Sequence, residues 1–234
     1  MFRVLGIGAQ KAGTSWLYEM LLRHSAISFP QGKEVHFWNH PATLSRALIQ
    51  DYLRKFSDPE HIEGEITPAY GTLNAGRVRL IHDWQPRLRL LFVMRNPIER
   101  AWSSALMALK RAELEFGEAS EQWFIDHFRS HGSLARGDYL HTIKTWQNAF
   151  GADALLILQY QDIALAPRTL LDRVAEHIGI DPNGFNALSD EMLRKKVFQG
   201  IDETIPDALR GVLEAIYRPR IHALERYLGE SLQW

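Results

Sequence analysis

The chain has 234 residues, of which 46% are hydrophobic and 24% charged, and its formal net charge is −1. These values are typical of a globular protein with a substantial core, and the lack of net positive charge disfavours a nucleic-acid partner. The absence of cysteine excludes disulfides and thiol chemistry, and the absence of a signal-peptide core or a bilayer-spanning apolar run predicts a cytoplasmic protein with no membrane span.

The apolar pattern predicts strands and helices in alternation along the first part of the chain. In order, these elements are a strand over residues 3–7, a helix over 14–23, a helix over 43–56, a short strand ending at Pro68 and a helix over 76–84. Residues 25–40 mix Ser, Pro, Gly and aromatic residues, and indicate a functional loop. The stretch "LRLLFVM", residues 88–94, is typical of a parallel strand covered on both faces.

The same alternation continues to the end of the chain. We expect one more strand over residues 154–160, and helices over 97–112, 118–130, 138–149, 167–178 and 206–228, the last broken near Arg218-Pro219. Strands alternating with helices favour an α/β fold with a central parallel β-sheet flanked by helices. No change in composition marks a boundary, so residues 1–234 are expected to form a single domain.

The stretch "GAQKAGTSW", residues 8–16, follows directly after the first predicted strand. In open α/β sheets ligands bind beyond the carboxyl ends of the strands. The small residues of this stretch let backbone N–H groups turn inward, Thr14 and Ser15 begin a helix, and Lys11 adds a mobile charge. The stretch therefore indicates an anion site, although a capped glycine turn is also a common structural feature.

A second anion site is expected at the end of the central strand. Arg95 follows "LLFVM", Asn96-Pro97 begins a helix, and Ser103 lies about two turns, or roughly 10 Å, further along. A guanidinium and a hydroxyl together match a phosphate dianion. The alternative is that Arg95 forms an ion pair at the start of the helix with Glu99.

The loop "QGKEVHFWNH", residues 31–40, brings Lys33, Glu34, His36 and His40 together in sequence beside the first anion site. A carboxylate or an imidazole here can take a proton from an attacking hydroxyl. The alternatives are a solvated glutamate and a packed histidine. His36 and His40 also have the spacing of a metal pair, but the residues lack the zinc-protease pattern and a third ligand, so no metal is expected.

Five stretches together resemble the PAPS-dependent sulfotransferases, in particular the heparan-sulfate-modifying enzymes and their bacterial relatives. They are "GAQKAGTSWL", "EVHFW", "GEITPAY", "RNPIERAWSS" and "YRPRIHALERYLGESLQW". The resemblance covers nearly the whole chain in the right order. It implies a P-loop-like three-layer fold. It also implies transfer of a sulfuryl group from 3′-phosphoadenosine 5′-phosphosulfate (PAPS) to an acceptor hydroxyl on a sugar, lipid or small metabolite, with PAP as the product and no metal.

The resemblance also implies roles for individual residues. The phosphosulfate would be held by Lys11, Ala12, Gly13, Thr14, Ser15 and Trp16. The 3′-phosphate would be held by Arg95 and Ser103, with Lys196 in the place of a basic loop that closes over it in relatives. Glu34 matches the catalytic base of the glycan enzymes, and His36 stays a second candidate because the small-molecule sulfotransferases use a histidine. Lys11 would supply charge to the departing phosphate.

Other positions match the family less specifically or depart from it. The stretch "RGDYLHTIKTW" resembles a family helix, which would place Arg136, Gly137 and Tyr139 near the nucleotide. Tyr70 is expected near the pocket, and the role of Lys195 and Lys196 is open. The aromatic residues Phe37-Trp38, Trp102 and Trp123 are expected in the core.

Two departures concern the acceptor. Ile66 stands where glycan enzymes often have a lysine, and Asn39 replaces an acidic residue usual in animal members. Both weaken the expectation of an animal-type heparan acceptor and leave the donor half unaffected. The acceptor and the oligomeric state are not readable from the sequence. The alternatives are a small-molecule kinase of the P-loop class, disfavoured because Lys11 lies three residues before Thr14, and a catalytically silent binding module of the same fold.

Overall fold

A computed structural model describes residues 2–42, 44–195, 197 and 203–234. Its centre is a five-stranded sheet of order β2-β3-β1-β4-β5 in which every neighbouring pair is parallel. The strands are β1 (Phe2–Gly8), β2 (Ile27–Ser28), β3 (Ile62–Ile66), β4 (Arg89–Met94) and β5 (Leu155–Gln159). Because β1 lies between β3 and β4, the loops that follow these three strands meet at one edge of the sheet.

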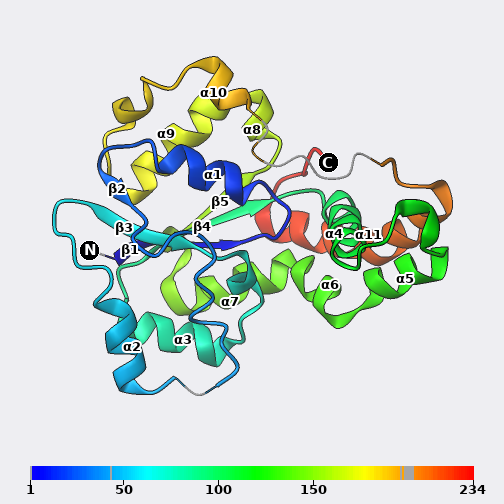
Figure 1. The fold of residues 1–234 in the computed structure, drawn as a ribbon, viewed down its shortest axis with the longest axis horizontal. Helices are drawn as coiled ribbons and strands as arrows, with labels where there is room; N and C mark the ends of the chain where they lie inside the picture. The colour runs from blue at the N-terminus through cyan, green and yellow to red at the C-terminus, as the bar shows by residue number, and fades with distance from the viewer. Residues whose placement is uncertain (1, 43, 196, 198–202) are drawn as a thin grey trace.

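Helices cover both faces of the sheet (Figure 1). On one face lie α1 (Thr14–Leu21), α8 (Asp162–Leu165), α9 (Pro167–Ile178) and α10 (Asp190–Arg194). On the other face lie α2 (Arg46–Leu53), α3 (Ala75–Trp84) and α7 (Tyr139–Phe150). The expected three-layer α/β fold is therefore confirmed.

A further group of helices lies to one side of the sheet, on the right of Figure 1. It consists of α4 (Pro97–Arg111), α5 (Glu121–Arg129), α6 (His131–Arg136) and α11 (Asp207–Leu228). These helices bury an apolar cluster of their own, which includes Trp102, Phe128 and Leu213. The remaining helical turns are η1 (Pro68–Thr72), η2 (Phe116–Glu118), η3 (Ala152–Ala154) and η4 (Pro182–Phe185).

The predicted elements agree with the structure wherever a long apolar pattern supported them. The helix predicted over 167–178 has these bounds, and Asn96 caps α4 by accepting from the Ile98 amide at 2.9 Å. The helix predicted over 43–56 is shorter at both ends in the structure. It begins later because Ser45 caps α2 and accepts from the Leu48 amide at 3.3 Å. The stretch interpreted as a loop over 25–40 contains β2, which is only two residues long.

The expected break in the last helix is wrong, because α11 continues through Pro219. Proline removes one backbone hydrogen bond, yet a helix can continue when its side chains are held on both sides of the proline. Before it, the buried Tyr217 donates from its hydroxyl to the Ser133 carbonyl at 3.3 Å. After it, Arg220 donates to the Leu134 carbonyl at 2.9 Å, and Leu224 is buried.

In the part of the chain that the structure describes, no helix is both long enough and apolar enough to cross a membrane.

Candidate active site

The loop between β1 and α1 forms an open turn of backbone amides. The first hydrogen bond of α1 runs from the Leu17 amide to the Gly13 carbonyl at 3.1 Å, and Gly13 provides no side chain to cap the helix. The amides of the first turn are therefore free to meet a ligand, and the helix dipole favours an anion there. Ala12 and Thr14 are buried, so neither side chain extends from the turn into solvent.

Gly13 is the position at which this loop requires glycine. Its φ is +82°, and an added Cβ would lie 2.4 Å from Cδ1 of Ile163 and 3.0 Å from the Tyr160 ring. The residues that follow β5 therefore press directly against the loop. A side chain here would push the turn away from this wall.

Arg95 joins the loop to the end of β4. Its Nη1 donates to the Lys11 carbonyl at 3.1 Å, and its guanidinium lies 4.8 Å from the centre of the Tyr160 ring. The Tyr139 hydroxyl donates to the Arg95 carbonyl at 2.8 Å and holds the backbone in place. The alternative ion pair with Glu99 is not what holds Arg95, because the Glu99 carboxylate lies 3.9 Å from Arg210 on α11.

Five cations are linked by charge interactions that begin at this loop with Lys11 and extend through Arg111 to α6: Lys11, Arg95, Arg100, Arg111 and Arg136, called here the cationic cluster. Burial lowers the pKa of the Lys11 ammonium, and the charges of Arg95 and Arg111 lower it further. Burial also lowers the pKa of Arg136, with contributions from Arg100 and Arg111. Among the described residues, none of the five is paired with a carboxylate at ion-pair distance. An anion bound here would supply the missing negative charge.

Arg100 is the most deeply buried member of the cationic cluster, with 0% of its surface exposed. One of its nitrogens donates to the Ser133 carbonyl at 3.1 Å and to the Tyr217 hydroxyl at 3.3 Å. Its Nε and Nη1, and the Nε of Arg136, have no hydrogen-bond partner among the described residues. A buried guanidinium without an anion is costly, so the local surplus of charge fits a ligand carrying phosphate groups.

The other residues predicted to hold the donor are placed in different ways. Trp16 is buried and its Nε1 donates to the Leu193 carbonyl at 2.8 Å, which leaves its backbone rather than its ring to the ligand. Ser103 is half-buried in α4, and Ser15 is half-buried in the first turn of α1. Lys195 is exposed after α10, and Lys196 lies outside the described residues.

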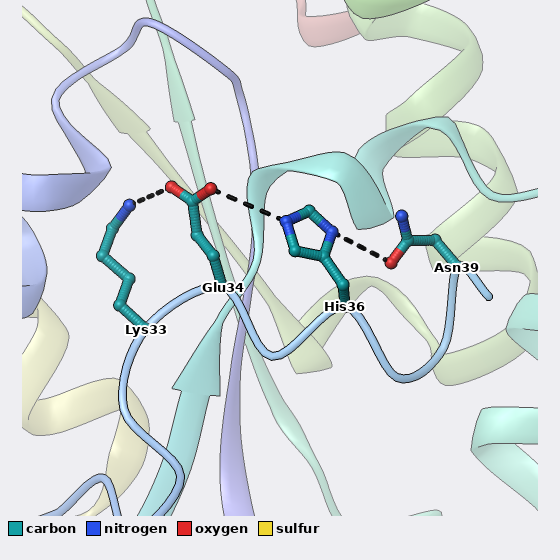
Figure 2. Close-up of polar contacts among 4 residues, drawn as sticks. All are labelled: Lys33, Glu34, His36 and Asn39. Atoms are coloured by element: carbon teal, nitrogen blue, oxygen red, sulfur yellow. Dashed lines mark hydrogen bonds and ion pairs between the residues drawn. The ribbon is translucent and has the colours of Figure 1, made fainter.

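The 31–40 loop carries the candidate base. Figure 2 shows the side chains of Lys33, Glu34, His36 and Asn39 in a row along this loop. Glu34 is in contact with the Lys33 ammonium on one side, and its Oε2 lies 3.7 Å from Nε2 of His36 on the other. The other ring nitrogen of His36 lies 3.2 Å from Oδ1 of Asn39. The Glu34 side chain is 46% exposed, so it can meet a substrate.

His40 and Tyr70 are both engaged with backbone amides of nearby residues. The Nδ1 of His40 accepts from the Ala42 amide at 3.2 Å and so stabilises the next turn. Tyr70 is fully buried, and its hydroxyl accepts from the Trp38 amide at 3.2 Å. Trp38 and Trp102 are buried, as expected, whereas Phe37 and Trp123 are half-buried.

Backbone strain coincides with the candidate site. Among the described residues, the non-glycine residues with positive φ are Lys11, Glu34, His36 and Glu113. Three of these four are the proposed catalytic residues. Left-handed backbone is unfavourable for such side chains and is found preferentially at functional sites.

The placement of histidine and carboxylate side chains bears on whether the described residues could hold a metal ion. Within the ranges that the structure describes, no group of three or more histidine or carboxylate side chains is placed to hold a metal ion.

Comparisons with known proteins identify the family. The family described as "Sulfotransferase domain" matches residues 3–201. The mouse heparan sulfate glucosamine 3-O-sulfotransferase 6 is 24% identical over 254 residues, which cover 99% of this chain and 73% of that protein. The mouse heparan sulfate glucosamine 3-O-sulfotransferase 5 is 33% identical over 109 residues, which cover 46% of this chain and 31% of that protein.

Solved structures share the fold. A sulfotransferase from Alicyclobacillus acidocaldarius superposes with a TM-score of 0.73 at 24% identity, covering 99% of this chain and 97% of that one. A mouse sulfotransferase complexed with PAP gives a TM-score of 0.58 at 16% identity, covering 97% and 88%. The chain belongs to the sulfotransferase domain family, and the expected PAPS-dependent enzyme class is confirmed at the level of that family.

Proposed function

We propose that Glu34 is the general base in the transfer of a sulfuryl group from PAPS to an acceptor hydroxyl. In this reaction Glu34 accepts the proton of the hydroxyl as its oxygen attacks sulfur. The bond between sulfur and the 5′-phosphate oxygen breaks, and its electron pair stays on the phosphate. Lys11 stabilises that charge from the neighbouring loop. His36, 3.7 Å from Glu34, orients the carboxylate and remains the second candidate for the base.

The donor is proposed to lie across the ends of β1 and β4. The amides of residues 13–16 and the Lys11 ammonium would bind the phosphosulfate, whereas the Ala12 amide already donates to the Ala9 carbonyl at 3.3 Å. Arg95 and Ser103 would bind the 3′-phosphate, with added charge from Arg136, which the family resemblance places near the nucleotide, and from Arg111, which the sequence did not predict. One observation carries this proposal: Arg95 is bonded to the Lys11 carbonyl within a cluster of cations that has no carboxylate counterpart among the described residues.

The acceptor is proposed to carry a sugar hydroxyl, because matched relatives are named for sulfating heparan sulfate. Ile66 is fully buried where glycan enzymes often have a lysine, so the contacts to the sugar must differ from theirs. We propose to compare an N-sulfated heparan oligosaccharide, a long-chain alcohol and 4-nitrophenol as acceptors of labelled sulfate. Transfer to the alcohol or the phenol, with none to the oligosaccharide, would reject the proposal that the acceptor is a sugar. The cytoplasmic location also stays a prediction, and fractionation of expressing cells tests it.

The role of Glu34 as the base is tested with Glu34→Gln. Turnover is measured as the transfer of labelled sulfate from PAPS to an acceptor, and PAP affinity is measured by calorimetry. Removing a general base lowers turnover by roughly 10²–10⁴-fold and should leave PAP affinity within about twofold. Lys55→Gln, an exposed residue after α2, is the control for a change of charge. Equal loss of turnover and PAP affinity would show that Glu34 is structural, and retained turnover would move the role to His36.

A further inference from the structure

A carboxyl group that the proposed reaction does not use lies beneath the 31–40 loop. Glu65, in the middle of the buried part of β3, has 0% of its surface exposed. On the same side of the strand, Glu63 accepts from the Asp58 amide at 3.1 Å, so the two carboxyl groups have different surroundings. A group as polar as Glu65 is retained in a core at a cost, which calls for a reason in the structure around it.

The hydroxyls of two tyrosines face Glu65, Tyr52 from α2 and Tyr70 from η1. Burial raises the pKa of Glu65 to about 7, and interaction with both hydroxyls partly offsets that rise. Burial and the nearby carboxyl group in turn raise the pKa of both tyrosines. Yet no described residue completes a hydrogen bond of ordinary length and angle to either carboxyl oxygen. The three groups therefore form a close polar cluster, with Glu65 at its centre.

The 31–40 loop is attached to this cluster by the residues that follow the candidate base, and to β3 by the candidate base itself. The amide of Trp38 donates to the Tyr70 hydroxyl at 3.2 Å, and the Phe37 ring stacks on the Tyr52 ring at 4.0 Å. The Trp38 and Tyr52 rings also form an edge-to-face contact, with 5.3 Å between their centres. At the other end, the amide of Glu34 donates to the carbonyl of Ile66, the residue after Glu65, at 2.9 Å. The backbone that carries Glu34 and His36 therefore spans between β3 and the two tyrosines.

We propose that Glu65 is a positioning residue, whose carboxyl group lies against the Tyr52 and Tyr70 hydroxyls and, through the packing of these two tyrosines, holds Glu34 in its left-handed backbone conformation. This inference rests on the proposed role of Glu34 as the base. Glu65 does not touch the reacting atoms. It acts through Tyr70 on Trp38, and through Tyr52 on Phe37. The strained conformation of Glu34, with φ of +61°, needs such support from its surroundings.

The test compares Glu65→Leu, which removes the polar group, with Glu65→Gln, which keeps the shape and the hydrogen-bonding capacity. Amide hydrogen exchange of residues 34–38 should rise at least about tenfold in Glu65→Leu and stay near wild type in Glu65→Gln. Turnover of labelled PAPS should fall by roughly 10–100-fold in Glu65→Leu, because a misplacement of about 1 Å has this effect, while PAP affinity stays within about twofold. Glu65→Gln should restore most of the turnover.

Two further variants separate the possible outcomes. Val174→Ala, in the core under α9, is the control for lost stability alone and should leave exchange of residues 34–38 unchanged. In a Glu34→Gln background, Glu65→Leu should cause no further loss of turnover if it acts through Glu34. Unchanged exchange and turnover in Glu65→Leu, or equal loss of PAP affinity and turnover, would overturn the inference. A fully active Glu34→Gln would instead overturn the proposed base.

Discussion

Lys11 and Glu34, the two charges that the proposed reaction uses, are prepared differently by their surroundings. Lys11 is half-buried, which lowers its pKa, and the charges of Arg95 and Arg111 lower it further. Glu34 is exposed, and its charge is balanced by Lys33 and by His36 when the imidazole is protonated. The first side chain is thus set to stabilise a charge that develops on a ligand, and the second to exchange a proton.

Glu65 gives a prediction for stability against pH. The native protein keeps this proton up to about pH 7, whereas the ordinary value of the group, expected in the unfolded chain, is 4.5. The native state therefore binds more protons between these values, and its free energy of unfolding falls as pH rises through this window. Relative to that of Glu65→Gln, the free energy of unfolding of the wild type should fall by about 3 kcal/mol between about pH 4.5 and pH 8.

Chemical denaturation of both proteins across this pH range measures the difference. Glu230→Gln, an exposed carboxylate near the end of the chain, serves as the control and should follow the wild type. Parallel curves for wild type and Glu65→Gln would mean that Glu65 has an ordinary pKa in the folded protein.

The β1–α1 loop is the element on which the donor site depends most. Gly13→Ala would force a left-handed alanine against Ile163 and Tyr160, and so shift the amides that open α1. PAP affinity should fall by at least about tenfold, because amide hydrogen bonds and the helix dipole both act over short distances. Calorimetric titration with PAP measures the effect.

Gly229→Ala is the matched control, since Gly229, with φ of +72° and ψ of +18°, has the same left-handed conformation but no atom within 4 Å of an added Cβ. It should lower stability by about 1 kcal/mol and leave PAP affinity unchanged. Equal loss of PAP affinity in both variants would mean that backbone strain, and not the shape of the loop, controls binding.

The strands and long helices could be predicted because their apolar residues recur with a clear period, as in β4 and α9. The short β2 could not be predicted, because two residues show no period. The predicted break of the last helix at Pro219 was wrong, because the packing of Tyr217 and Leu224 outweighs the loss of one backbone hydrogen bond. Sequence motifs identified the loops around Lys11 and Arg95, since each follows a predicted strand, and the loop around Glu34, since Ser, Pro, Gly and aromatic residues mix there between two predicted helices.

The rest of the site depends on contacts between distant elements. Arg111 and Arg136 come from different helices, and only the packing of α4 against α6 brings their charges together. Glu65 stands within a recognised motif, but its partner Tyr52 lies on α2, and nothing in the spacing shows that they meet. Glu65 and Tyr52 carry polar groups into the interior, which an apolar pattern does not signal.

The molecule as a whole joins two apolar clusters, one around the sheet and one among α4, α5 and α11. Tyr139 packs in the first cluster and bonds to the Arg95 carbonyl, while Tyr217 packs in the second and bonds to α6. We propose that residues 1–234 form one domain, so the unfolding curves described above should show a single transition. The proposed donor site lies where the sheet meets the helical group.

Calorimetric titration of the full chain with PAP and with ADP, each with and without magnesium, tests the account most directly. The cationic cluster is proposed to bind phosphate at both ends of an adenosine without a metal. PAP should therefore bind at least about tenfold more tightly than ADP, with no dependence on magnesium. Equal affinity for the two nucleotides, or binding of ADP that requires magnesium, would contradict the account and favour a kinase.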